Sequence, residues 1–200
     1  MLGHITGLLF SPESAWQKIK SELDKGSCHT TVLVIILGLI PPISGYIGTT
    51  MIGWQLGAGD PIKLTNTSAG YISVLYFFAI VVGINAVALA IRWMSETYDA
   101  QVSYQHSLAL SAFTAVPLLL VGIFEIYPVL WLNFLVGLLA LALSVRLLYT
   151  GVPIILGVDK ERGFLYSSSI LAFGLIALVA MLVVTALLWG LGLEPTLVSY

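Results

Sequence analysis

The chain has 200 residues, of which 58% are hydrophobic and only 9% are charged. Soluble domains carry about 25% charged residues, so this chain lacks the polar groups that a water-facing surface needs. The formal net charge of -2, with eight basic residues, argues against a nucleic-acid partner, and the single cysteine rules out an intrachain disulfide. The composition predicts an integral membrane protein whose first partner is the lipid bilayer.

Residues 1–29 are predicted to form a cytoplasmic segment. Its first ten residues lack a basic region and a long apolar core, so we expect the first membrane helix to serve as its own insertion signal. A helix is predicted over Ser11 to Lys25, in which Trp16, Ile19 and Leu23 make one narrow apolar stripe. Two interpretations stay open: an amphipathic helix on the membrane surface with Trp16 at headgroup depth, or a short helix packed on the bundle.

Five apolar stretches then define a transmembrane domain over residues 30–190, because about 20 apolar residues cross a ~30 Å hydrocarbon core. The predicted spans are 30–53, 71–93, 107–124, 129–150 and 166–189. Residues 191–200 are predicted to form an extracytoplasmic tail. The predicted fold class is therefore an all-α membrane protein, a five-transmembrane-helix bundle with a short N-terminal amphipathic interfacial helix.

The lysine and arginine residues are distributed very unevenly between the two sides of this predicted topology. One side receives Lys18, Lys20, Lys25, Arg92, Arg146, Lys160 and Arg162. The other side receives only Lys63. Because basic residues collect on the cytoplasmic side, the pattern predicts a cytoplasmic N-terminus and a C-terminus on the opposite, periplasmic side.

Prolines and a glycine lie within two of the predicted spans and just after a third. Pro41 and Pro42 lie in the middle of the first span and Pro117 lies in the third. Gly151 and Pro153 are predicted to end or bend the fourth helix. These breaks either kink helices for packing or line a site, as discontinuous transporter helices do. The packing interpretation is favoured for the first span and for the end of the fourth.

A polar cluster is predicted near the cytoplasmic face, where the second span ends and the fourth exits. Its members are Arg92, Glu96, Asp99, Arg146 and Tyr149. Since charged groups at membrane depth are costly unless paired, one hypothesis pairs Arg146 with Glu96 or Asp99. The alternative is that both arginines are anchors whose long side chains reach the interface.

The remaining polar residues do not indicate a catalytic or metal-binding site. Asn85 and Asn133 are interpreted as hydrogen-bonding groups between helices, and Glu125 as a lone carboxylate in the short outer turn. Cys28 and His29 lack the spacing of a zinc site. No nucleotide-binding, metalloprotease or serine-hydrolase motif is present, so no catalytic residue, metal or cofactor is predicted.

Three stretches in order carry a family resemblance. They are FSPESAWQKI near the N-terminus, YDAQVSYQHSLALSAFTAVP before and within the third span, and RLLYTGVPIILGVDKERGF at the end of the fourth. Together they resemble the Yip family of Ypt/Rab-interacting membrane proteins, in its bacterial, YohC-like inner-membrane branch. Asp99-Ala100 departs from the glycines more common in that family's linker. The resemblance implies five membrane helices with a cytoplasmic N-terminus.

Two functional hypotheses follow. The leading one is a non-enzymatic inner-membrane protein that acts through contacts with lipids, with other membrane proteins or with itself as a homo-oligomer. The alternative is a small transporter or channel for an ion or small solute, because the helix breaks are suited to lining a polar path. A dry bundle interior favours the first hypothesis, and a water-accessible polar cavity favours the second.

Overall fold

The computed structural model describes residues 2–54, 61–98, 100, 102–191 and 194–198. Within these residues the chain is helical and has no β-strand beyond two isolated bridges. The elements in order are α1 (Leu2–Phe10), α2 (Pro12–Asp24), α3 (Thr30–Gly38), α4 (Ile40–Ile47), the π-helical turn η1 (Gly48–Ile52), α5 (Asn66–Met94), the 3₁₀ turn η2 (Ser95–Tyr98), α6 (Tyr104–Val121), the 3₁₀ turn η3 (Gly122–Ile126), α7 (Leu130–Leu156) and α8 (Lys160–Gly190).

Five helical segments of the described chain are long and apolar enough to cross a membrane, which confirms the predicted architecture. They are Thr30–Ile52, Asn66–Tyr98, Tyr104–Ile126, Leu130–Leu156 and Lys160–Gly190. Several extend beyond the predicted spans because polar caps start the helices outside the apolar stretch. The Asp159 carboxylate accepts a hydrogen bond from the Arg162 backbone N–H at 2.8 Å, and so caps the start of α8.

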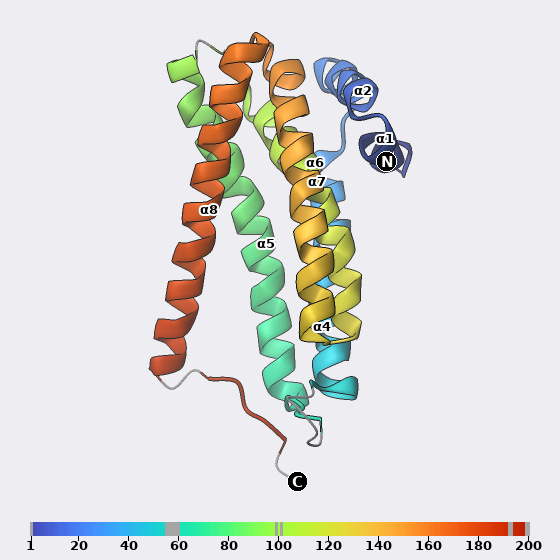
Figure 1. Cartoon of the computed structure of the whole chain (residues 1–200), viewed down its shortest axis with the longest axis vertical. Coiled ribbons are helices and arrows are strands. Elements are labelled where there is room, and N and C mark those ends of the chain that lie inside the picture. The colour runs from blue at the N-terminus through green and yellow to red at the C-terminus, as the bar shows by residue number, and fades with distance from the viewer. Residues whose placement is uncertain (1, 55–60, 99, 101, 192–193, 199–200) are drawn as a thin grey trace.

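The bundle has two distinct ends (Figure 1). We call the end that carries α1 and α2 the α2 end, and the opposite end, which carries residues 194–198, the tail end. At the tail end the Val198 backbone N–H donates to the Lys63 carbonyl at 2.9 Å. The Thr65 backbone N–H donates to the Thr196 carbonyl at 3.1 Å. The segment after α8 is therefore attached to the loop between η1 and α5.

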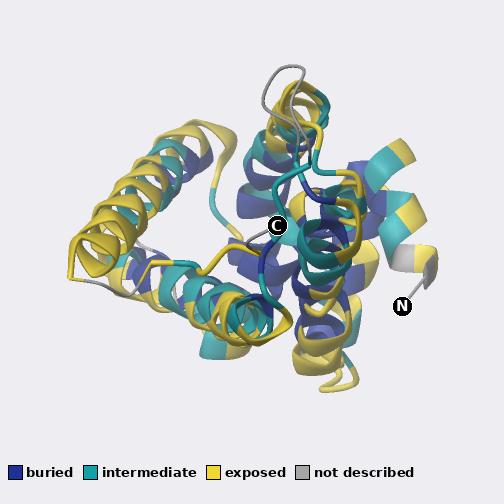
Figure 2. Cartoon of the chain, turned by 90° about the horizontal axis from the view of Figure 1, so that it is seen from below, coloured by how far each residue is buried: buried dark blue, intermediate teal, exposed yellow. Residues whose placement is uncertain are grey.

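The core is concentrated in α2, α6 and the α2 end of α7, whereas α8 stands at the edge (Figures 1 and 2). The second half of α8, residues 176–190, is exposed at every position except Ala177. In a bilayer such a surface faces lipid or a partner helix, because no water is present there to penalise apolar exposure.

The prolines interrupt the helices less than predicted. The break in the first span is confirmed: α3 ends at Gly38 and α4 begins at Ile40, because Pro41 and Pro42 have no N–H to donate. Pro117 lies inside an uninterrupted α6. Gly151 and Pro153 were predicted to end or bend the fourth helix, and the first of these alternatives is wrong.

The fourth helix, α7, continues to Leu156 and is capped by Gly157, whose φ of 69° lies in the left-handed region. The missing Pro153 N–H removes only one bond near the C-terminus of the helix. The Gly157 N–H donates to the Pro153 carbonyl at 3.1 Å and closes the last turn.

Candidate functional site

The apolar stripe of α2 is covered by the protein itself. Trp16 is 0% exposed and its ring meets the Phe113 ring edge-on, with centroids 6.2 Å apart. A Cβ added at Gly151 would lie 2.7 Å from the Trp16 ring, so this glycine makes room for the indole. The Asp24 carboxylate lies 3.1 Å from His106 Nε2 and fastens the end of α2 to α6. Of the two interpretations left open for this helix, the contacts favour the one in which it packs on the bundle, because the partners of Trp16 are α6 and α7.

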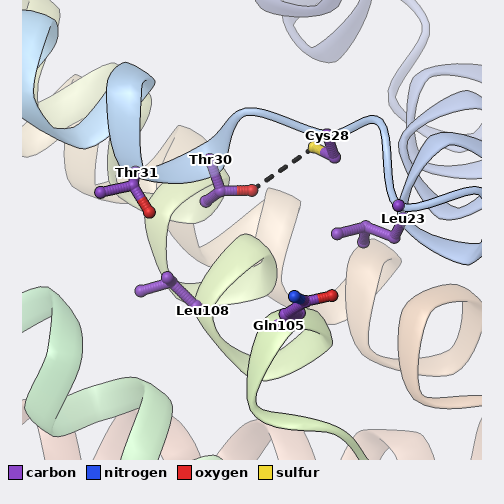
Figure 3. Close-up of a pocket in the computed structure, with 7 residues that line it drawn as sticks. Leu23, Cys28, Thr30, Thr31, Gln105 and Leu108 are labelled. Atoms are coloured by element: carbon purple, nitrogen blue, oxygen red, sulfur yellow. Dashed lines mark hydrogen bonds between the residues drawn. The ribbon is translucent and has the colours of Figure 1, made fainter.

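A small polar pocket of about 100 Å³ lies at the joint between α2 and α3 (Figure 3). Cys28 Sγ and Thr30 Oγ1 are 3.4 Å apart on one wall, and Gln105 and Leu108 of α6 form another. The pocket is too small for a drug-sized ligand, since such pockets are about 300 Å³ or larger. In the described part of the chain no group of three His, Cys, Asp or Glu residues is arranged to hold a metal ion.

The predicted polar cluster is only partly assembled. Arg92 and Glu96 line one open hollow of about 450 Å³ at the α2 end, together with Ser95 and Ser103. Asp99 lies outside the described residues. Among the residues that are described, no ion pair joins Arg146 to Glu96.

Ser144, Leu147 and Leu148 occupy the side of α7 that packs against the bundle. Arg146 lies on the exposed side of the same helix, which explains why it forms no ion pair with Glu96. Tyr149 has a separate role. Its hydroxyl lies 2.8 Å from Ser168 Oγ and its ring contacts Phe164 at a centroid distance of 5.3 Å, so it joins α7 to α8.

Two of the predicted break residues, Pro41 and Pro153, pack closely against glycines of neighbouring helical segments. A Cβ added at Gly122 would lie 2.5 Å from Pro41 Cγ, which shows that the Pro41 ring fits against this glycine at the end of α6. A Cβ added at Gly163 would lie 2.8 Å from Pro153 Cγ. These contacts favour the packing interpretation of the breaks over a gate.

The two asparagines behave differently from each other. The Tyr104 hydroxyl donates to Asn85 Oδ1 at 2.5 Å and links α6 to α5, as predicted for Asn85. Asn133 Nδ2 instead donates to the carbonyls of Tyr127 at 2.8 Å and Val129 at 3.2 Å, so it stabilises the turn before α7. The interhelical role predicted for Asn133 is not seen.

Glu125 is not alone at the tail end. The Tyr76 hydroxyl of α5 donates to Glu125 Oε1 at 3.0 Å. A Cβ added at Gly45 would lie 3.0 Å from Glu125 Oε2, and one at Gly48 would lie 2.1 Å from the Glu125 carbonyl oxygen. The turn that carries Glu125 therefore sits directly on two glycines of the first span.

A lateral groove of about 310 Å³ is the main cavity that sequence reasoning missed. Four helices line it: α5, α6, α7 and α8. Its lining residues carry no charge, and Leu118, Leu141, Leu175 and Leu178 on its rim are exposed, so the groove opens sideways to the surroundings of the bundle. The four helices come from separate parts of the sequence, and the only local signals are the glycines and hydroxyls within otherwise apolar helices.

These features define a polytopic helical membrane protein with a docked N-terminal helix and a lateral apolar groove. The chain belongs to the Yip family, since residues 6–181 match the Yip1 domain. It is 37% identical over 191 residues to the inner membrane protein YohC of Escherichia coli strain K12, which covers 96% of this chain and 98% of that protein.

YohC from Escherichia coli O6:H1 strain CFT073 matches with the same identity and coverage. The resemblance seen in the sequence is thereby confirmed. No solved structure matches the chain. The relatives and the five apolar helices together support a multi-pass inner-membrane location.

Proposed function

We propose that this Yip-family protein acts through lateral contacts with lipids or proteins inside the inner membrane, without catalysing a reaction. The observation that carries the proposal is the apolar groove between α5, α6, α7 and α8, which opens sideways. A groove of this kind admits molecules from the bilayer rather than from water. The exposed outer half of α8 beside it offers further surface for the same contacts.

The transporter or channel hypothesis has weaker support. A polar path needs charged or hydrogen-bonding side chains along its length, because ions lose their hydration shells in a pore. The lining of the groove holds three hydroxyls but no charged side chain, and Arg146 is not part of it. Close contacts of Gly151 with Trp16, of Pro153 with Gly163 and of Pro41 with Gly122 support a packing role for these break residues.

We also propose that the α2 end faces the cytoplasm and the tail end the periplasm. The basic residues of α2, of the end of α5, of the second half of α7 and of the start of α8 lie toward the α2 end. Lys63 lies at the tail end, beside Val198. The positive-inside rule assigns the more basic end to the cytoplasm.

Photo-crosslinking in native membranes tests the proposed function. A photoreactive residue replaces Val183, on the exposed half of α8, and a control label replaces Glu13, on the exposed face of α2. We expect the α8 label to capture a defined lipid or protein that also co-purifies with the chain in polymer-extracted membrane discs. Purely random lipid adducts with no co-purifying molecule, or flux of a solute into proteoliposomes, would contradict the proposal.

A further inference from the structure

Two hydroxyl groups in the lateral groove have no hydrogen-bond partner. Ser144 on α7 and Thr114 on α6 both line the groove, and the oxygen atoms of their side chains are buried and unpaired. Ser144 is only 5% exposed. A buried hydroxyl without a partner costs about 1–3 kcal/mol, so the pair indicates that something else completes their hydrogen bonds.

Other hydroxyls of α7 and α8 show what a satisfied membrane hydroxyl does. The hydroxyls of Thr150, Ser167, Ser168 and Thr185 each donate to the carbonyl four residues earlier, at 2.7–2.9 Å. Ser111, a third hydroxyl of the groove, donates to the Ile84 carbonyl at 2.8 Å. Ser144 makes no such bond, although it lines the groove.

The depth of Ser144 restricts what can reach it. It lies fourteen residues after Leu130 and twelve before Leu156. At 1.5 Å per residue it is roughly 21 Å and roughly 18 Å from the two ends of α7, a helix longer than a ~30 Å hydrocarbon core, so Ser144 lies within the apolar part of the bilayer. The ester groups of a phospholipid stay at the interface, so they do not reach this level.

The size of the groove restricts the occupant further. One turn of a helix with its side chains fills roughly 420–610 Å³, given a diameter of 10–12 Å and a pitch of 5.4 Å. The groove, at about 310 Å³, is smaller than that and lies at the lower limit of small-molecule pockets. A small molecule therefore fits better than a partner helix.

Two glycines keep the groove open. Gly83 on α5 and Gly174 on α8 line it, and a Cβ added at either would meet no atom within 4 Å. Elsewhere in the bundle glycines such as Gly151 and Gly163 serve close contact, with added Cβ atoms at 2.7 Å and 2.8 Å from their neighbours. Gly83 and Gly174 are not in close contact with a neighbouring helix, so their missing side chains leave open space in the groove.

We propose that the groove binds a neutral, lipid-soluble molecule with carbonyl oxygens in an apolar body, of the isoprenoid-quinone class. The hydroxyls of Ser144 and Thr114 donate to its carbonyl oxygens inside the groove, and the leucine and isoleucine side chains surround the rest. This inference rests on the proposed function of lateral contacts and names the chemistry of one such contact.

Binding of ubiquinone-2 to the full chain in lipid nanodiscs tests the inference. We expect saturable binding of the radiolabelled quinone, and none of a prenyl hydrocarbon that lacks carbonyl oxygens. The double variant Ser144→Ala, Thr114→Val should bind about thirtyfold more weakly, the loss expected for two net hydrogen bonds. Thr185→Val is the matched control, since Thr185 bonds to Met181 and lies outside the groove.

A second pair of variants fills the groove. Gly83→Leu and Gly174→Leu add side chains to open space, and each should weaken quinone binding at least tenfold while the thermal unfolding temperature is retained. Gly137→Leu on α7 also has open space but lies outside the groove, so its binding should be unchanged.

Equal binding of the quinone and the hydrocarbon, or binding that none of the groove variants alters, would overturn the inference. If no quinone binds but the Val183 label still captures a defined lipid or protein, only this inference fails. If neither is observed, the proposed function fails as well.

Discussion

At the residue scale, two glycines of the same helix have opposite structural roles. A Cβ added at Gly151 would be 2.7 Å from Trp16 and 2.9 Å from Leu110, whereas one at Gly137 in the same helix would meet nothing within 4 Å. Neither the Val-Gly-Leu context of Gly137 nor the Thr-Gly-Val context of Gly151 says which glycine lies at a helix contact. The distinction depends on which helix packs against each face.

Replacing Gly151 with alanine should therefore destabilise the protein. The added methyl group overlaps the Trp16 ring and Leu110, and overpacking of this kind costs about 1–3 kcal/mol. Thermal unfolding of the purified protein in detergent measures the effect as a lower unfolding temperature. Gly137→Ala is the matched control and should be neutral or slightly stabilising, because alanine is the better helix former. An equal response of the two variants would show that α2 does not dock as described.

At the element scale, α2 shows where amphipathicity alone leaves a choice. Its stripe of Trp16, Ile19 and Leu23 fits a membrane surface as well as a protein surface. The structure buries all three residues against the bundle. Gly151 decides the outcome, because it opens a gap in α7 wide enough for an indole.

Trp16→Ala should release α2 from the bundle. Truncating a fully buried tryptophan costs about 3–5 kcal/mol, which exceeds what the Asp24–His106 contact can offset at a partly exposed site. Cys28, at the joint between α2 and α3, is the single cysteine of the chain and reports the release without further engineering. We expect a thiol reagent to label it at least tenfold faster in the variant.

Trp93→Ala provides the control for this experiment. Trp93 is 78% exposed at the end of α5, so its removal should leave the Cys28 labelling rate unchanged. Unchanged labelling in Trp16→Ala as well would contradict the docked position of α2.

At the scale of the whole molecule, the odd number of crossings places the two ends of the chain at opposite ends of the bundle (Figure 1). Reporter fusions test the sidedness that we propose. A fluorescent protein fused at the N-terminus should be active in the cytoplasm, and an alkaline phosphatase fused after residue 200 should be active in the periplasm. A fusion at the loop near Lys63 serves as internal control and should match the C-terminal one. The same compartment for both termini would contradict the five-span topology.

The polar cluster could be predicted in part from the sequence, whereas the groove could not. Arg92 and Glu96 are four residues apart on one continuous helical stretch, so they were expected together and they do share a hollow. Arg146 comes from another helix, and its direction depends on how α7 is rotated. The groove combines four helices, and its key residues Ser144, Thr114, Gly83 and Gly174 are common types in membrane helices.

The sequence by itself determined the class of the protein, the number of crossings, the break at Pro41-Pro42 and the family. These properties follow from apolar run length, from the missing proline N–H and from motifs in order along the chain, all of which are local. The tertiary structure alone decided where α2 packs, which glycines are contacts and which are openings, and that a lateral groove exists. Helices in a membrane associate through close packing rather than through hydrophobicity. The face that each helix presents to its neighbours therefore cannot be predicted from its apolar pattern.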